Sequence, residues 1–355
     1  MVNRNAVASS IRGIRRNRVA VGASIVLLSQ GSRNGNPGLE VATASQLADK
    51  NSPKTANLPA ESLMATATPK IKRPKIGFHA PIKGGLHESL IVAKEIGCDA
   101  VQIFSRNPRG WMAKPLTPEA IELFRRTRKQ TKLSPVLIHT NYLINMAAAD
   151  QTILLKSIAS FREEVERALL LGVDYLVLHP GSARDSCEAD AIEICALSLK
   201  LACKGLNLGR LRILLENTAG QGQCIGHRFE HLRAIMDACP ELRLGVCIDT
   251  AHSFTAGYDI READGLEATL EIVRRTVGLR NVRAVHFNDS RAPYNSRVDR
   301  HWHIGEGHIG REALRRFAQH PKLAHAAFIL ETPYDDPRAD LKNLEALRSF
   351  VNGKR

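Results

Sequence analysis

The sequence has 355 residues and a mass of 39.1 kDa, within the range of one large α/β barrel with an extension. Hydrophobic residues make up 44% and charged residues 24% of the chain, which excludes a wholly disordered or fibrous protein. The 50 Lys and Arg against 36 Asp and Glu give a formal charge of +14, which favours a polyanionic partner. No apolar run reaches the roughly 18 residues of a membrane span, so we expect a soluble protein without a membrane partner.

Residues 1–74 differ in composition from the rest of the chain. They are rich in Ser, Asn, Ala and Arg, show no sustained period, and end in a Pro/Lys stretch. Residues 1–75 hold twelve Lys and Arg against three Asp and Glu, or +9, which leaves +5 for residues 76–355. We predict a disordered basic N-terminal extension, whose charge could add non-specific attraction to DNA.

Two other interpretations of this segment stay open. The apolar run from Val19 to Leu28 follows three arginines and resembles a signal peptide or an arginine-rich transit sequence for an organelle. Met64 is an alternative initiator, which would make the extension an overextended start. The seven cysteines contain no C-x-x-C pair and lie mostly in apolar runs, so we expect them to be reduced and buried. This favours a cytoplasmic, nucleoid-associated protein.

From Lys75 onward, a short apolar, β-branched run alternates with a longer stretch of helical period, eight times over. Because near-continuous apolar strands need burial on both faces, residues 75–355 predict a single (β/α)8 TIM barrel. An open doubly wound sheet is the structural alternative, but its usual glycine-rich phosphate loop is missing. The predicted strands are Ile76 to His79, Ala100 to Ser105, Pro135 to His139, Tyr175 to His179, Arg212 to Glu216, Leu244 to Asp249, Val282 to His286 and Ala327 to Glu331. The predicted helices are Glu88 to Ile96, Thr117 to Arg128, Ile153 to Leu171, Asp190 to Lys204, Phe229 to Ala238, Leu266 to Val277, Arg311 to Gln319 and Leu341 to Val351.

Seven of the eight predicted strands end in a residue type that binds metals. In a barrel these carboxyl ends converge on one face, where active sites are built. Imidazoles and carboxylates crowded together would carry a high desolvation cost unless a cation compensated them, so we predict a metal site. The strand-end residues are His79, His139, His179, Glu216, Asp249, His286 and Glu331.

Three further residues extend this set. His252 follows Asp249 by three positions, and Asp299 and His301 flank one residue in a segment where both side chains can grip one ion. So many ligands exceed the needs of one zinc ion and suggest two or three metals. Nitrogen and carboxylate ligands without thiolate favour zinc or manganese. We expect the remaining histidines, His227 and His231 among them, to lie at the surface or behind the ligands.

Several motifs follow one another in a specific order and spacing. They include His139-x-x-Tyr142-Leu143-Ile144-Asn145, His179-Pro180-Gly181-Ser182, Glu216-Asn217-Thr218-Ala219-Gly220-Gln221-Gly222, Asp249-Thr250-Ala251-His252, His286-Phe287-Asn288-Asp289-Ser290 and Ser296-Arg297-Val298-Asp299-Arg300-His301. From about Lys75 to the C-terminus, the chain resembles endonuclease IV, the zinc-dependent apurinic/apyrimidinic endonuclease family of base-excision repair. The resemblance implies the same (β/α)8 barrel.

The resemblance also implies a ligand set. His139, His179 and Glu216 would hold a first zinc ion, and Glu216 would bridge to a second. Asp249, His286 and Glu331 would complete that second site; His252, Asp299 and His301 would bind the third ion, with manganese possible at one position. Arg109 and Tyr142 match family positions that enter the DNA at the lesion. Ala251 and Asn295 depart from the family pattern, where Cys and Gly are usual.

The activity implied is hydrolysis of the phosphodiester 5′ to an abasic site in duplex DNA, leaving a 3′-hydroxyl and a 5′-deoxyribose phosphate. Trimming of blocked 3′ ends would use the same chemistry. Our hypothesis is that hydroxide bridging the ions joined by Glu216 attacks phosphorus, while Glu331 orients it. Nothing in the sequence demands more than a monomer.

Two other functions remain as alternatives. A metal-dependent sugar isomerase or epimerase can use the same barrel and ligand types, but has no use for a third metal group or for Arg109 with Tyr142. A non-catalytic lesion binder would be expected to have lost part of the ligand set, and none of the nine positions is vacant.

Overall fold

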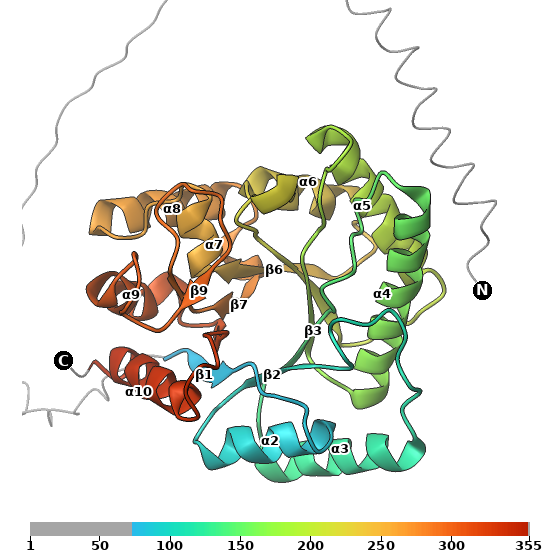
Figure 1. The fold of residues 1–355 in the computed structure, drawn as a ribbon, viewed down its shortest axis with the longest axis horizontal. Helices are drawn as coiled ribbons and strands as arrows, with labels where there is room; N and C mark the ends of the chain where they lie inside the picture. The colour runs from blue at the N-terminus through green and yellow to red at the C-terminus, as the bar shows by residue number, and fades with distance from the viewer. Residues whose placement is uncertain (1–72, 354–355) are drawn as a thin grey trace, which may run out of the picture. The chain divides into compact units, whose positions relative to one another are not determined.

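The computed structural model describes residues 73–353 and contains an eight-stranded parallel barrel (Figure 1). The strand order is β1-β10-β7-β6-β5-β4-β3-β2, and a parallel bridge between His79 and Gln102 brings the two ends of the sheet together. The prediction of a TIM barrel is therefore confirmed. The predicted extension, residues 1–74, lies outside the described residues except for its last two positions, so the domain boundary stays a prediction.

All eight predicted strands are present, each within a residue or two of the expected bounds. Their hydrogen-bonded cores are short and almost fully buried, as expected for a parallel sheet covered on its outer face. The strands are β1 (Lys75–Phe78), β2 (Val101–Phe104), β3 (Val136–His139), β4 (Tyr175–Leu178), β5 (Arg212–Glu216), β6 (Leu244–Asp249), β7 (Val282–His286) and β10 (Ala327–Leu330).

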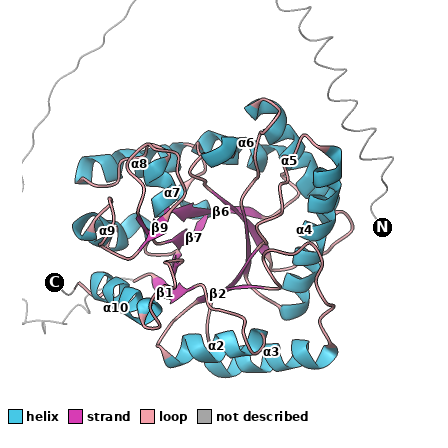
Figure 2. Cartoon of the chain, in the orientation of Figure 1, coloured by secondary structure: helices cyan, strands magenta, loops and turns pink. Residues whose placement is uncertain are grey.

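Helices surround the barrel, as Figure 2 shows. Several begin with a side-chain cap: Asp150 accepts a hydrogen bond from the amide of Ile153, and Thr117 accepts one from Ala120. The eight that follow the strands are α2 (Leu86–Glu95), α3 (Pro118–Thr131), α4 (Gln151–Leu171), α5 (Glu188–Cys203), α6 (Phe229–Ala238), α8 (Ala263–Arg275), α9 (Arg311–Ala318) and α10 (Ala339–Val351).

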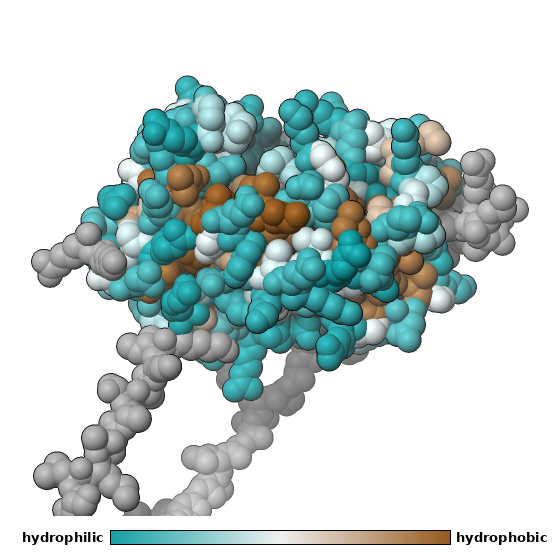
Figure 3. Space-filling view, turned by 90° about the horizontal axis from the view of Figure 1, so that it is seen from below, coloured by the Kyte–Doolittle hydropathy of each residue, from teal (hydrophilic) through white to brown (hydrophobic). Residues whose placement is uncertain are grey.

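The outer surface is mostly polar. Figure 3 shows the molecule from the side of α2 and α3, where hydrophilic side chains surround a band of apolar ones. Single apolar side chains reach solvent on the helices, such as Val92 on α2 and Leu341 on α10. None of the described helices is long and apolar enough to cross a membrane.

The inside of the barrel is a packed core of small and branched side chains. Alternate residues of each strand point inward, and the central layer is Ala100, Leu137, Val177, Leu214, Cys247, Ala284, Ala327 and Ile329. On six strands, the residue two positions after a member of this layer is a predicted metal ligand. The alternation of the strand therefore directs each of those ligands inward, above the core, at the carboxyl end of the barrel.

Three elements near this end were not predicted from the sequence. A short helix, α7 (Thr250–Thr255), follows β6 directly, and Asp249 caps it by accepting a hydrogen bond from the amide of His252. A two-stranded antiparallel hairpin, β8 (Asp289–Ser290) with β9 (His301–Trp302), closes the loop after β7. These elements position the ligands that lie outside the eight strands.

No disulfide joins the seven cysteines, all of which lie in the described part of the chain, and five of them are buried, as expected. Burial raises the pKa of Cys247 to about 12, so its thiol stays protonated beside the carboxylates of the barrel mouth. Two cysteines contradict the prediction of burial. Cys187 is exposed because it occupies the N-cap of α5, and Cys224 is half-buried in the loop after β5.

Candidate metal centre

The mouth of the barrel brings together the nine residues that the sequence marks as ligands. They line or underlie a cavity of about 370 Å³ whose walls include Tyr142, Phe104 and His79. We call these nine residues the candidate metal centre, and they form three overlapping groups: His139 with His179 and Glu216; Glu216 with Asp249, His286 and Glu331; and His252 with His301, Asp249 and Asp299.

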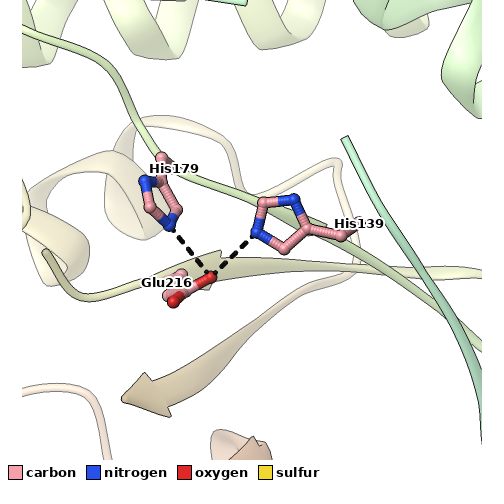
Figure 4. A group of neighbouring side chains, drawn as sticks. All are labelled: His139, His179 and Glu216. Atoms are coloured by element: carbon pink, nitrogen blue, oxygen red, sulfur yellow. Dashed lines mark hydrogen bonds and ion pairs between the residues drawn. The ribbon is translucent and has the colours of Figure 1, made fainter. Parts of the chain in front are cut away.

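The first group is built on three neighbouring strands. His139 ends β3, His179 follows β4 and Glu216 ends β5. The Nε2 atoms of His139 and His179 lie 3.3 Å and 3.2 Å from the same oxygen of Glu216, and Figure 4 shows both imidazoles turned toward it. Glu216 is fully buried. Three ligand atoms this close fit one tetrahedral cation with an open position.

The second group shares Glu216 with the first. The other oxygen of Glu216 lies 2.9 Å from Nδ1 of His286, and an oxygen of Glu331 lies 3.0 Å from the same nitrogen. Asp249 approaches within 4.8 Å of these atoms. Glu216 therefore faces one group with each oxygen, the arrangement of a bridging carboxylate.

The third group lies on the elements after the strands. Nε2 of His252, on α7, is 3.1 Å from Asp299, and Nε2 of His301, on β9, is 3.5 Å from the other oxygen of Asp299. Asp249 also reaches this group, 3.4 Å from His301. The structure thus brings together His252, Asp299 and His301 as expected from the resemblance, with Asp249 between the second and third groups.

Hydrogen bonds on the outer nitrogen fix which imidazole nitrogen faces the cavity. In His139, His252 and His301, Nδ1 lies 2.7 to 3.1 Å from a backbone carbonyl oxygen, so Nδ1 carries the proton. Their Nε2 atoms then hold lone pairs. The Nε2 atoms of His252 and His301 are only 3.3 Å apart. Two facing lone pairs among carboxylates need a cation between them, so the donor set fits metal ions.

Contacts between histidines and carboxylates shift the pKa values of the residues in the barrel mouth. Burial alone would raise the pKa of Glu216, but His286 and His179 outweigh it and hold the pKa well below the usual range. Burial would likewise lower the pKa of His252, but Asp249 and Asp299 outweigh it and hold that pKa well above the usual range. In the metal-free protein these groups stabilise one another as ion pairs, in the place that cations would take.

Gln102 is a residue of this site that sequence reasoning missed. It is fully buried on β2; its Oε1 accepts a hydrogen bond from Nε2 of His286 at 2.9 Å, and its Nε2 donates to Glu331 at 2.6 Å. In the neutral ring, the first bond leaves Nδ1 of His286 without a proton, so this nitrogen can bind a cation beside Glu216. Gln102 lies two residues after Ala100 of the core layer, and this strand position is the signal that could have found it.

His79, the first of the strand-end histidines, lies beside this network without joining the three groups. Its Nδ1 is 3.3 Å from Glu331 and 3.1 Å from the amide nitrogen of Gln102. Its Nε2 is buried and has no hydrogen-bond partner among the described residues. Burial lowers the pKa of His79, so the imidazole is neutral there.

Asp289 organises the loop that follows β9, the strand of His301. Its buried carboxylate accepts hydrogen bonds from the backbone amides of Gly305, Gly307 and Ile309, at 2.9 to 3.1 Å. A Cβ atom on Gly307 would lie 2.4 Å from the carbonyl oxygen of Ser290, so only glycine fits this turn. No pattern in the sequence pointed to this role, because an acidic residue after a strand is commonplace.

The two residues that the resemblance assigns to DNA stand at the rim. Tyr142 is 65% exposed, and its ring packs edge-on against Phe104 with centroids 5.3 Å apart. Arg109 is exposed on the neighbouring loop, which accepts a hydrogen bond from the amide of Tyr142 through the carbonyl of Pro108. Both side chains are therefore free to meet a partner in front of the cavity.

The two departures from the family pattern fit their backbone. Asn295 has φ 56°, in the left-handed region that glycine favours and that asparagine tolerates best among other residues. Ala251 is buried in α7, where a small side chain is accommodated.

We expected His227 and His231 to lie at the surface or behind the ligands. Both are instead buried in a separate cluster beside α5. They approach Glu188 of α5 at 3.5 and 3.4 Å, away from the barrel mouth. The amide of Gly226 donates to Nδ1 of His231, so Nε2 of that ring carries the proton and donates to Glu188. Nδ1 of His227 lies 2.9 Å from the carbonyl oxygen of Cys224, and the cluster joins the start of α5 to α6 and to the loop before α6.

Comparison with known proteins places the chain in a family. Residues 90–350 match the family model described as a xylose isomerase-like TIM barrel. The probable endonuclease 4 of Solibacter usitatus is 46% identical over 283 residues, which cover 79% of this chain and 98% of that protein. The crystal structure of endonuclease IV from Thermus thermophilus aligns with a TM-score of 0.71 at 39% identity, covering 79% of this chain and 100% of that one. A D-tagatose 3-epimerase-like protein, at 20% identity and a TM-score of 0.59 over 78% of this chain and 97% of its own, shares the fold alone. The chain belongs to the endonuclease IV family.

Proposed function

We propose that this protein is a DNA-repair hydrolase that cleaves the phosphodiester 5′ to abasic sites in duplex DNA. The products are a 3′-hydroxyl and a 5′-deoxyribose phosphate, and the same site trims blocked 3′ ends. It holds three zinc ions, with manganese possible at one position, and acts as a monomer. The observation that carries the proposal is the facing lone pairs and carboxylates of nine residues at one barrel mouth.

Hydrolysis of the phosphodiester needs an activated water and positive charge beside the phosphoryl oxygens. When bound, divalent ions in the three groups would bring the pKa of coordinated water near 7 and neutralise charge on the phosphoryl oxygens. Glu216 would hold the first two ions at a fixed spacing, because each of its oxygens faces a different group. Glu331 is fixed through one oxygen by Gln102, and its other oxygen, 3.0 Å from Nδ1 of His286, would face the second group and orient the attacking water.

Residues at the rim of the cavity recognise the abasic site. Tyr142 can stack where a base is missing, and Arg109 can enter the groove beside it. An abasic nucleotide has no base to unstack, so extruding it toward the cavity costs less than extruding an intact nucleotide. The exposure of both side chains in front of the cavity supports these roles.

The sugar isomerase alternative uses the same barrel, but the third group argues against it. His252, Asp299 and His301 meet at 3.1 to 3.5 Å on elements outside the eight strands. An isomerase that works with one or two ions has no use for this group. The similarity to the endonuclease 4 of Solibacter usitatus, nearly over its full length, points the same way.

The test is incision of a duplex that carries one tetrahydrofuran abasic analogue, which blocks β-elimination and leaves hydrolysis as the only route. We expect a 3′-hydroxyl end from the zinc-loaded full chain, and loss of cleavage after chelation or in His179→Ala. His325→Ala, at the opposite end of the barrel, serves as the matched control and should cleave normally. An intact duplex with the zinc-loaded parent protein would contradict the nuclease assignment and turn attention to sugar substrates.

Glu331→Gln tests the role of the carboxylate. The amide keeps the side-chain volume but removes the charge that orients water, so we expect turnover to fall by at least about two orders of magnitude. Thermal unfolding should stay close to that of the parent, and turnover is expressed per zinc-loaded protein, because Glu331 also belongs to the second metal group. Near-normal single-turnover incision by a zinc-loaded preparation would reject this role for Glu331.

A further inference from the structure

A second cavity lies at the amino-terminal end of the barrel, opposite the candidate metal centre. Its volume is about 570 Å³, and its walls include the first residues of β1, β4, β5 and β10. We call it the amino-end cavity. No residue of the candidate metal centre lines it, so its role is independent of the proposed function.

Positive charge dominates the walls of this cavity. Asp174 is the only carboxylate among its lining residues, and it is already engaged by Arg128 and by the amide of Val136 at 2.7 Å. Arg73 is paired with Asp99 at 3.1 Å. Within residues 73–353, the other cations of the lining have no carboxylate partner: Lys75, Arg210, Arg212, Arg243 and Arg283.

Arg283 reaches this cavity because of a β-bulge. Val282 pairs with Val246 and Ala284 pairs with Cys247, so Arg283 is an extra residue in β7. Its Nε atom is buried and has no hydrogen-bond partner within the described chain. A buried guanidinium N–H without an acceptor is unfavourable, which adds to the cost of gathering these cations around the cavity.

The guanidinium groups also act on one another. Burial, followed by the like charges of Arg283 and Arg243, lowers the pKa of Arg212. Repulsion among three arginines around one cavity destabilises the folded protein unless a bound anion compensates their charge. The planar fork of each guanidinium suits bidentate contacts to phosphate oxygens.

We propose that the amino-end cavity binds a small ligand with two adjacent phosphate groups, of the inorganic diphosphate class. The volume exceeds that of one phosphate, and five cations without a carboxylate partner can neutralise a charge of about −3 or more. A DNA duplex is a less suitable occupant, because a double helix about 20 Å wide cannot enter so small a hollow. The ligand would sit at the far end of the barrel from the phosphodiester that is cleaved.

The experiment is isothermal titration of the zinc-loaded full chain with inorganic diphosphate and, separately, with inorganic phosphate. Arg212→Gln should bind diphosphate at least about tenfold more weakly than the parent, while Arg126→Gln, an exposed arginine on α3, should match the parent. Diphosphate that interacts with zinc at the barrel mouth does so in all three proteins, so the difference between them reports the amino-end cavity. Diphosphate should also bind the parent more tightly than phosphate does.

Equal diphosphate affinity in the parent and Arg212→Gln would overturn the proposal, as would displacement of the ligand by a short undamaged duplex. Without ligand, Arg212→Gln should be at least as stable as the parent, because it removes a repulsive charge, and it should incise abasic DNA normally. If that variant fails to fold, Arg243→Gln at the exposed rim provides the same comparison.

Discussion

Four of the five candidate ligand imidazoles at the barrel mouth have one nitrogen held by a hydrogen bond, and this bond decides what the other nitrogen can bind. His139, His252 and His301 use backbone carbonyls for the purpose, which no side-chain substitution removes. His286 instead depends on the side chain of Gln102, which also holds one oxygen of Glu331. In the second group, a side-chain substitution can therefore release an imidazole from the hydrogen bond that orients it.

We predict that Gln102→Leu weakens zinc binding to the second group roughly 10- to 100-fold, because His286 is freed to turn and Glu331 loses its donor. The measurement is zinc retained per chain during dialysis against graded chelator concentrations. Gln130→Leu, an exposed glutamine on α3, is the control and should retain zinc like the parent. Equal retention by Gln102→Leu and the parent would show that the ligands hold their places without Gln102.

Tyr142 allows a second test at the scale of one residue. Since 65% of its side chain is exposed, Tyr142→Ala should change unfolding little but cost roughly 1–3 kcal/mol of binding to abasic duplex through lost stacking. Binding is measured apart from cleavage by fluorescence anisotropy of a labelled abasic duplex, with protein whose metal ions have been removed by a chelator. Tyr334→Ala, at the other strongly exposed tyrosine, should bind like the parent. Similar affinities for all three proteins would remove Tyr142 from lesion recognition.

At the scale of elements, the hairpin β8–β9 and the loop at residues 303–310 act as one unit around Asp289. At least three backbone amides converge on its buried carboxylate, and the hairpin register pairs Ser290 with His301. The position of His301 in the third group therefore depends on Asp289, which is not itself a member of the candidate metal centre. Loop order and ligand geometry are coupled through this carboxylate.

Asp289→Ala should lower the free energy of unfolding by about 3 kcal/mol, because it leaves buried amides without an acceptor. Urea unfolding monitored by circular dichroism checks this value. Zinc content should fall by the ion of the third group while the first two groups are retained. Asp264→Ala, an exposed carboxylate in the first turn of α8, is the control and should change stability by less than about 0.5 kcal/mol. A parent-like stability for Asp289→Ala would mean that the loop is held by other contacts.

The eight strands could be predicted from the sequence because buried parallel strands are short, nearly continuous apolar runs. Six of the nine candidate ligands could be predicted because they end those runs. The α7 helix and the hairpin β8–β9 could not, since six-residue and two-residue elements are too short to show a period. Gln102 was missed because the predicted strand Ala100 to Ser105 runs past it. Its place follows only once Ala100 is known to point into the barrel.

At the scale of the whole molecule, closure of the barrel forces imidazoles and carboxylates into one buried mouth whose charge must be balanced by protons or by metal ions. Without metal, Asp249 and Asp299 hold the pKa of His252 well above the ordinary 6.5, and Cys247, Glu216 and Glu331 do the same for His286, against the opposing effect of burial. With metal, the same nitrogens must be unprotonated. The two forms of the protein therefore respond to pH in opposite directions.

The stability of the metal-free protein should fall as pH rises above about 6.5. The pKa values of these histidines are higher in the folded state than in the unfolded state, so the native state binds more protons in this range. The stabilisation that these protons provide is complete at pH values below the unfolded pKa, and it disappears as the pH rises through the folded pKa. The zinc-loaded protein should gain stability over the same interval, because proton competition for the ligands disappears. Urea unfolding at about pH 6.5 and 9, with and without chelator, measures both slopes.

Two variants assign that behaviour to the barrel mouth. His252→Gln should flatten the loss of stability in the metal-free protein, because it removes one imidazole that ion-pairs with Asp249 and Asp299. His325→Gln, whose ring contacts backbone carbonyls at the opposite end of the barrel, should leave both slopes as they are in the parent. Parallel slopes for the chelated and zinc-loaded parent would mean that protons and metal ions do not compete for the same nitrogens, and the donor set would then lie elsewhere.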